Sequence, residues 1–507
     1  MTAVTSARRR TFTLGPRARR RFTARILAMC ALACAIATLA ATPRAHGVLP
    51  PAFGGVLRLP LAAPLEDVDP ARQAHPLGAA VAAAIFDTLY AIDARGAVVP
   101  VLAESLPVPS VTTPGAFAIT LRSALRRHDG QRLVAADVVA ALRRAATMPR
   151  AAWLLGALAV GADGLPDVRA VGALQLELRP AREGVELARV LAARPLGIAV
   201  GDPRRRAIGT GAFAVRGAVG GSARETVLVQ HHAAALGAPY LERVTLLPPR
   251  PRDEDLRALE LGETDASWFG ATLYAAPAAG SRSAAETPAV CPVLLVASET
   301  GALRDAGLRG YVLASIDRRR LERAGLSADA RIAGADVTTA PSARAPATRP
   351  TLRLAVPSGD PLLARIAESL AAMLDERGVS VVVGAVPAVD APAAGGWDVR
   401  LVSVLPPLPG AAPLIGAALA AAGRADAARA LAAQLSDATA AAEAARRFDV
   451  VVLGRRRDTL HYHAALRDVR FDAALGTLEL ANIWLPRVLL PVASAAVRPA
   501  PARRPRR

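Results

Sequence analysis

Apolar positions along the chain follow two different periods. A helical period over residues 75–90 and 361–377 predicts helices, whereas short apolar runs at 352–356 and 379–383 predict strands. A strand, a helix and a second strand in this order form a βαβ unit with parallel strands. Gly378 suits the end of the helix. This part of the chain therefore predicts an α/β fold with a parallel sheet.

The same two periods recur on both sides of this unit. Asp137 is expected to cap one further helix. Helices are predicted at 137–146, 253–261, 304–323 and within the alanine-rich 411–447, and strands at 54–61, 98–102, 117–121, 174–178, 213–215, 226–230, 243–247 and 448–453. No period of about 20 to 50 residues recurs, which argues against a solenoid. The chain is predicted to be α/β in at least two lobes.

Residues 1–45 have the organisation of a secretory signal peptide. A basic segment is followed by an uncharged apolar run at 26–41 and then by small residues, with a cleavage point near Ala45. The run is shorter than the roughly 20 residues that span a bilayer, so cleavage is favoured and an uncleaved membrane anchor is the alternative. Two Arg-Arg-x-Phe stretches leave Sec and twin-arginine export both open. Cleavage leaves Cys291 as the remaining cysteine of the sequence, and one cysteine cannot form an internal disulfide.

The charge of the chain comes from arginine, since the sequence contains no lysine. The 507 residues hold 62 basic and 43 acidic side chains, giving a net charge of +19. Nine arginines lie in the first 45 residues, and most of the others are interspersed with acids. No basic stripe interleaved with aromatic residues appears, as a nucleic-acid groove would require. Biased composition explains the charge better than nucleic-acid binding.

The motifs of common catalytic sites are missing from the sequence. It contains no Gly-x-Ser-x-Gly, no His-Glu-x-x-His and no Gly-x-x-x-x-Gly-Lys. His461 and His463 alternate in a predicted strand, so both side chains could face one side. A surface pair is favoured over a metal site because no further ligands are assigned. We expect neither enzymatic activity nor a cofactor or metal.

Several short motifs occur in a fixed order along the chain. They are Gly54-Gly55-Val56-Leu57, Asp69-Pro70, Val99-Pro100-Val101-Leu102-Ala103-Glu104-Ser105, His128-Asp129-Gly130 followed by Ala135-Ala136-Asp137-Val138, Ile208-Gly209-Thr210-Gly211-Ala212-Phe213, Pro239-Tyr240-Leu241-Glu242, and Ala314-Ser315-Ile316-Asp317-Arg318. In this order and spacing the chain resembles the extracytoplasmic solute-binding proteins of the oligopeptide, dipeptide and nickel ABC importers, family 5.

The resemblance implies a two-lobed, periplasmic-binding-protein-like fold of class II, with an extra subdomain in the first lobe. The ligand would lie in the cleft between the lobes, which close about a hinge. The expected parts are a signal peptide at 1–45, a lobe I core of 50–66, 195–275 and 470–495, an extra subdomain at 67–194, lobe II at 276–469, and a disordered basic tail at 496–507.

The implied function is capture of a peptide or similar small polar solute for the membrane subunits of an ABC importer. The protein would act as a periplasmic or otherwise extracytoplasmic monomer. Peptide-binding members hold the peptide ammonium with an acid in the second lobe, but residues 402–409 here contain neither an acid nor an aromatic residue. A peptide, a metal chelate and another solute therefore all stay open.

The candidate cleft residues are Tyr90, Trp268 and Phe269, although core packing is the favoured role for each because aromatic side chains mainly supply buried area. Two other functions are also considered. One is a degenerate or membrane-tethered family member that acts as a sensor or scaffold. The other is a secreted hydrolase.

Overall fold

The computed structural model describes most of the chain after residue 50. The described residues are 51–61, 65, 67–73, 75–217, 219, 225–267, 282–286, 291–297, 301–327, 345–358, 360–386, 396–421, 423–447, 451–457 and 459–486. The chain divides into two compact units, 1–50 and 51–507, and all described residues belong to the second. The predicted signal peptide and basic tail lie outside the described residues.

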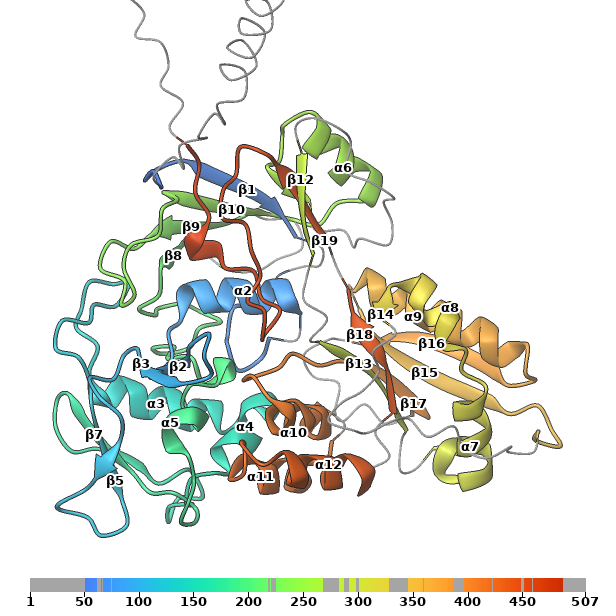
Figure 1. Ribbon diagram of the computed structural model, residues 1–507, viewed down its shortest axis with the longest axis horizontal. Coiled ribbons are helices and arrows are strands. Elements are labelled where there is room, and N and C mark those ends of the chain that lie inside the picture. Colours follow the sequence, from blue (N-terminus) through green and yellow to red (C-terminus); the bar gives the residue numbers. More distant parts are fainter. Residues whose placement is uncertain are drawn as a thin grey trace, which may run out of the picture. The chain divides into compact units, whose positions relative to one another are not determined.

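One four-stranded sheet brings together the beginning and the middle of the chain (Figure 1). Its order is β1 (Val56–Pro60), β10 (Arg243–Leu247), β9 (Thr226–Gln230) and β8 (Phe213–Arg216), with β1 parallel to β10 and the other pairs antiparallel. Leu57 and Leu59 alternate with more exposed neighbours and share a core with Val81 and Ile85 of helix α2 (Pro76–Ile85). Period-2 burial of this kind fixes which face of the strand packs inward.

A second group of elements follows α2 in the chain. The hairpin β2 (Tyr90–Ile92) and β3 (Val98–Pro100) precedes a sheet of order β4 (Val108–Pro109), β5 (Phe117–Thr120), β7 (Gln175–Leu178) and β6 (Val168–Ala170). The helices of this group are α3 (Ala135–Ala145), α4 (Pro149–Leu155), α5 (Leu187–Val190) and the 3-10 helix η1 (Arg194–Leu196). We call the described residues 51–267 and 459–486 lobe I.

A six-stranded sheet forms the centre of residues 291–457, which we call lobe II. Its order is β14 (Leu326–Ser327), β18 (Val451–Arg456), β13 (Pro292–Ala297), β17 (Val399–Ser403), β15 (Thr351–Pro357) and β16 (Ser380–Val386). Its helices are η3 (Ala302–Arg304), α7 (Ala306–Ala314), α8 (Arg318–Ala324), α9 (Pro361–Asp375), α10 (Ala411–Ala421), α11 (Ala425–Ala432) and α12 (Ala438–Arg447).

Strand β13 shows why helices cover both faces of this sheet. Val293 and Leu295 enter one core with Ile366 of α9, whereas Leu294 and Val296 enter another core with helices α10 and α11. Successive side chains of a strand point to opposite faces, so a continuous apolar run needs cover on both. Helices α10 to α12 provide the cover on the second face, and that core also takes in α4 of lobe I.

A three-stranded antiparallel sheet lies where the chain passes between the lobes. Its order is β11 (Ala266–Ser267), β19 (Thr459–His463) and β12 (Arg282–Glu286). Strand β19 begins three residues after β18 of lobe II ends. Helix α6 (Arg252–Glu260) precedes β11, and η4 (Leu480–Asn482) lies near the end of the described chain.

The predicted βαβ unit is confirmed, because β15 and β16 are parallel and α9 connects them. Other boundaries were predicted wrongly. The helix expected at 75–90 ends at Ile85, and the helix expected at 304–323 is interrupted between α7 and α8. Asp317 accepts a hydrogen bond from the backbone N–H of Arg319 and so starts α8 as a new helix.

The role predicted for Asp137 also needs correction. Helix α3 begins at Ala135, so Asp137 is its third residue rather than its N-cap. Its carboxylate accepts a hydrogen bond of 3.1 Å from the backbone N–H of Val134, just before the helix. Asp137 thus stabilises the same helix end by reaching backwards, as the acidic residue of a capping box does.

Candidate functional site

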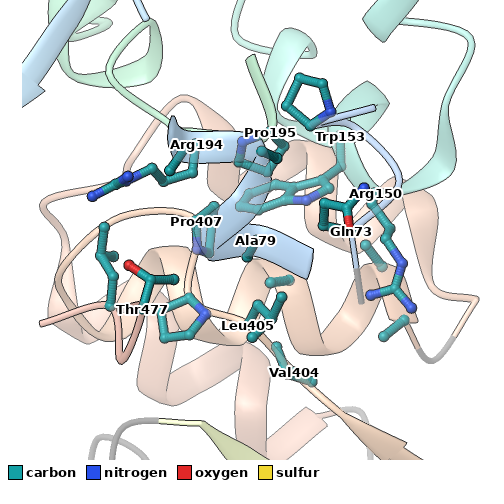
Figure 2. A pocket seen from close by; sticks show the side chains of 18 of the residues that line it. Gln73, Ala79, Arg150, Trp153, Arg194, Pro195, Val404, Leu405, Pro407 and Thr477 are labelled. Atoms are coloured by element: carbon teal, nitrogen blue, oxygen red, sulfur yellow. The ribbon is translucent and has the colours of Figure 1, made fainter. Parts of the chain in front are cut away.

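A cavity lies between lobe I and lobe II (Figure 2). Its volume is about 790 Å³, including the space open to solvent at its mouth. Lobe I contributes α2, α4, η1 and the region of Thr477, and lobe II contributes residues 404–407 and α10. A hollow enclosed by elements of two lobes is the usual setting of a small-molecule site.

Small side chains make room for the cavity, and one large aromatic ring forms its wall. Helices α2 and α10 face it mainly with alanines, namely Ala79, Ala82, Ala83, Ala417, Ala420 and Ala421. Trp153 of α4 is 2% exposed. A Cβ atom on Gly416 of α10 would lie 2.4 Å from Cζ3 of Trp153, so the ring packs directly on the α10 backbone. The indole is therefore held in place from both lobes.

Two arginines bring positive charge to the cavity. Figure 2 shows Arg150 and Arg194 on opposite sides, with Trp153 between them. No Asp or Glu occurs among the described residues that line it. Arg194 forms an ion pair of 3.3 Å with Asp472, and its backbone N–H donates a 3.0 Å hydrogen bond to the carbonyl of Pro407 in lobe II. The lining therefore favours a negatively charged group over a positively charged one.

Arg150 is the more desolvated of the two arginines. Burial, together with the like charge of Arg400 on β17, lowers the pKa of Arg150 to about 10. Both effects disfavour the charged form, yet Arg150 still carries its proton at pH 7. A desolvated guanidinium binds carboxylate and phosphate groups more strongly than an exposed one, because less water competes for its donors.

A half-buried carboxylate lies close to the Arg194 side of the cavity. Asp87 follows Phe86, which lines the cavity, and accepts a 2.8 Å hydrogen bond from the hydroxyl of Thr210. Burial raises the pKa of Asp87 to about 6, although this hydrogen bond and the charge of Arg194 act in the opposite direction. Asp87 and Asp472 together offset part of the positive charge at this side.

Of the residues predicted to line the cleft, Tyr90 is not among the described residues that line this cavity. Tyr90 is fully buried in the core of lobe I, and its hydroxyl donates a 3.0 Å hydrogen bond to the carbonyl of Ser105. Burial raises the pKa of the Tyr90 phenol. Trp268 and Phe269 lie outside the described residues. Ligand contacts for these three residues stay predictions, and the burial of Tyr90 favours its packing role.

Sequence reasoning missed Arg150, Trp153 and Arg194. Proline at the first position of α4 and at the second position of η1 would have marked local helix starts near both arginines. With 62 arginines in the chain, however, no individual one stands out. Their importance becomes visible only when burial and the shared cavity are known.

The second-lobe segment without an acid forms part of the cavity wall. Val404, Leu405, Pro406 and Pro407 line it, so a carboxylate that could receive a peptide ammonium is missing at this wall. His461 and His463 lie on β19 away from the lining residues. The described part of the chain contains no cluster of three or more metal-ligating side chains. Within that same part, no helix has the length and apolar character needed to cross a membrane.

Comparison with known proteins gives one family match and many structural matches. Residues 97–333 match the family described as bacterial extracellular solute-binding proteins, family 5 middle region. No curated protein matches the chain in sequence at a significant level.

Three solved structures illustrate the shared fold. The Escherichia coli murein tripeptide binding protein MppA has a TM-score of 0.70 and 15% identity, covering 86% of this chain and 99% of its own. NikA from Staphylococcus aureus in complex with Ni(L-His)2 has a TM-score of 0.69 and 14% identity, and the match covers 85% of this chain and 100% of NikA. AgaA from A. tumefaciens R10 in complex with agropinic acid has a TM-score of 0.65 and 16% identity, and the match covers 85% of this chain and 99% of AgaA. The chain therefore has the two-lobed α/β fold of these binding proteins.

Proposed function

Residues 97–333 match the bacterial extracellular solute-binding proteins of family 5, and on that premise we propose that the chain is such a protein and captures a small anionic solute for an ABC importer. The solute carries at least one carboxylate or phosphate group. It binds in the cavity between the lobes, outside the cytoplasmic membrane, and is passed on to the membrane subunits. Peptide and nickel-type importers are the class that such a receptor serves.

The observation that carries this proposal is the charge of the cavity lining. Arg150 and Arg194 face it from opposite sides, and no carboxylate is found among its described lining residues. A planar guanidinium donates two parallel hydrogen bonds to a carboxylate or phosphate. Trp153 and the alanines of α2 and α10 offer an apolar surface for the body of the solute. The lining thus suits a compact molecule with negatively charged ends.

The same lining argues against an ordinary free peptide. A peptide brings an ammonium group as well as a carboxylate, and a buried ammonium needs an acceptor of opposite charge. The wall at residues 404–407 offers apolar side chains instead. Among proteins of the same fold, one was solved with agropinic acid and another with Ni(L-His)2, and both ligands contain carboxylates. These ligands support a small acid or a chelate as the kind of solute to test first.

Binding and lobe closure together make up the proposed activity. A solute that contacts both lobes stabilises the closed arrangement by its difference in affinity for the two states. The family consists of binding proteins, and no observation favours a sensor, a scaffold or a secreted hydrolase over solute capture.

Mass spectrometry of the solutes released from the purified protein tests the proposal directly. We expect a small acid, a phosphate compound or a chelate. Calorimetry with that solute should show a 10- to 100-fold loss of affinity in Arg150→Gln and in Arg194→Gln, as expected for a lost hydrogen bond to a charged group. Arg205→Gln is the matched control, because the side chain of Arg205 is 90% exposed. A purely cationic or neutral solute, or unchanged affinity in both variants, would contradict the proposal.

A further inference from the structure

We propose that Thr477 is a further specificity-determining residue, whose hydroxyl donates a hydrogen bond to the same anionic group of the solute that Arg194 binds. This inference concerns the same cavity and rests on the proposed function. It adds a hydrogen-bond donor to one end of the cavity, and it identifies Asp472 as the residue that positions this donor close to Arg194.

The hydroxyl of Thr477 is a buried polar group at the cavity wall. Thr477 lines the cavity and is 5% exposed. Its backbone carbonyl accepts a 2.8 Å hydrogen bond from the backbone N–H of Asp472, whereas its hydroxyl has no hydrogen-bond partner among the described residues. A hydroxyl that is withdrawn from bulk water is stabilised by a new partner. The cavity is the place from which such a partner can come.

Asp472 brings Thr477 and Arg194 to the same end of the cavity. Its Oδ1 accepts hydrogen bonds from the backbone N–H groups of Ala474 and Leu475, at 2.9 Å and 3.0 Å. Its Oδ2 lies 3.3 Å from Nη2 of Arg194. One carboxylate therefore organises the turn that carries Thr477 and also orients the guanidinium.

The turn that presents Thr477 is closed by its own backbone. Phe471 and Leu478 pair as an antiparallel bridge at its two ends. Gly476 has a φ of 68°, in the left-handed region that glycine adopts without steric cost, and its N–H donates a 2.8 Å hydrogen bond to the carbonyl of Asp472. Leu475 is buried and also lines the cavity. The Thr477 hydroxyl is thus largely preorganised, which lowers the entropy cost of binding a solute.

Two donors of different kinds meet at this end of the cavity. Figure 2 shows Thr477 on the same side as Arg194, with Arg150 on the other side. A carboxylate or phosphate has at least two acceptor oxygens, so one can accept from the guanidinium and another from the hydroxyl. Because Asp472 already shares the charge of Arg194, affinity at this end depends on oriented hydrogen bonds as well as on charge.

Calorimetry on the purified full chain tests the inference. The probes are glutarate, which has a carboxylate at each end, and inorganic phosphate. We expect Thr477→Val, which removes the hydroxyl and keeps the shape, to bind the probe about 10-fold more weakly than wild type. Thr477→Ser keeps the donor and should stay within about 3-fold of wild type.

A matched control is available at Thr264. This residue is fully buried, and its hydroxyl also has no partner within the described chain, but it is not among the described residues that line the cavity. Thr264→Val should therefore leave probe affinity unchanged. An equal loss of affinity in Thr264→Val and Thr477→Val would overturn the inference, because it would reveal a general effect of removing a buried hydroxyl.

A double-mutant cycle separates a shared binding role from a merely structural one. If Thr477 and Arg194 hold the same group, the double variant Thr477→Val with Arg194→Gln should lose clearly less affinity than the product of the two single losses. Thr477→Val with Arg150→Gln should lose that full product, because Arg150 binds at the other side. Unchanged affinity in Thr477→Val, or a full product with Arg194→Gln, would overturn the inference.

The outcomes also distinguish this inference from the proposed function. If Arg150→Gln and Arg194→Gln weaken binding while Thr477→Val does not, anion capture stands and the role of Thr477 falls. A loss measured with glutarate supports a carboxylate at this end, and a loss measured with phosphate supports a phosphate group. If neither probe binds, the acid released from the purified protein replaces them in the same series. Release of cationic or neutral solutes alone would contradict both proposals.

Discussion

His128 is a neutral, half-buried side chain that holds a glycine turn in place. Its Nδ1 accepts a 3.2 Å hydrogen bond from the backbone N–H of Gly209, and its Nε2 lies 3.1 Å from the carbonyl of Gly211. This pattern requires the tautomer with the proton on Nε2. The ring also meets His231 edge to face, with centroids 4.8 Å apart. Burial lowers the pKa of His128 to about 4, so protonation would break the bond to Gly209.

His128 and Asp87 respond to acid in opposite directions. The lowered pKa of His128 means that its stabilisation is present above pH 6.5 and is lost as the pH falls towards 4. The pKa of Asp87 is raised from 3.8 to about 6, so its contribution is complete below pH 3.8 and is lost as the pH rises towards 6. Each shift corresponds to about 3 kcal/mol in the free energy of unfolding. In the wild type these two effects largely cancel between pH 4 and pH 6.

Single substitutions should reveal each of the two effects. In Asp87→Asn, the free energy of unfolding should rise by about 3 kcal/mol between pH 4 and pH 6.5, because only the His128 effect is left. Urea unfolding at several pH values measures this. In His128→Asn the free energy should instead fall as the pH rises from 4 to 6. Parallel pH profiles for wild type and both variants would show that neither group has the shifted pKa described here.

At the scale of elements, a buried ion pair connects a helix with a strand of lobe II. Asp360 accepts hydrogen bonds from the backbone N–H groups of Leu362 and Leu363 and so caps α9. Its other oxygen lies 2.6 Å from Nη1 of Arg456 on β18. Burial alone would raise the pKa of Asp360, but the charges of Arg456 and His75, together with the hydrogen bonds from Arg456 and the backbone of Leu363, lower it on balance. Nη2 of Arg456 lies 3.5 Å from Nε2 of His75, the N-cap of α2 in lobe I.

Removing one partner of this pair should destabilise the protein strongly. Asp360→Ala is expected to lower the free energy of unfolding by about 3 to 5 kcal/mol, since it breaks a buried ion pair by removing one of its two charges. Urea unfolding measures the loss. The double variant Asp360→Leu with Arg456→Met should be less destabilised than Asp360→Ala, because it removes both charges.

An exposed ion pair between helices provides the control. Nη1 of Arg320 on α8 lies 2.7 Å from Oε2 of Glu376, the residue after α9. The side chain of Arg320 is 29% exposed and that of Glu376 is 61% exposed. Arg320→Gln should change the free energy of unfolding by less than about 1 kcal/mol. If Arg320→Gln and Asp360→Ala lowered the free energy of unfolding by the same amount, the importance assigned to burial would be contradicted.

At the scale of the whole described molecule, one apolar core extends across both lobes. It contains Trp153 and Leu154 of α4 together with Ile415 and Leu419 of α10. Polar contacts reinforce it, since Arg189 donates a hydrogen bond to the carbonyl of Pro409 and Ser436 contacts Glu186. The lobes therefore meet through their own side chains as well as through any solute between them.

Adding a side chain at Gly416 should separate this interface. Gly416→Val places atoms in the space of the Trp153 ring, and such overpacking costs about 1 to 3 kcal/mol when the surroundings cannot yield. We expect a larger radius of gyration by small-angle scattering and weaker solute binding. Trp153→Leu in the same chain should restore the smaller radius by making room. An unchanged radius in Gly416→Val would show that α4 and α10 can part without opening the lobes.

The sequence alone was sufficient for features that depend on neighbouring residues. Hydrophobic periods predicted the βαβ unit of β15, α9 and β16, and ordered short motifs indicated the family and its fold. Boundaries such as the end of α2 at Ile85 were missed, because alanine-rich helices give little contrast between their faces and their ends. Motifs such as His128-Asp129-Gly130 turned out to build turns and so carried the fold more than the site.

Only the tertiary structure could identify the candidate site. Arg150 and Arg194 of lobe I share the cavity with Val404 of lobe II, which lies more than 200 positions further along the chain. Local patterns depend on spacings of two to four residues, so they contain no information about which distant arginines meet. Packing decides that, because burial removes water from a few arginines among 62 and places them around one cavity.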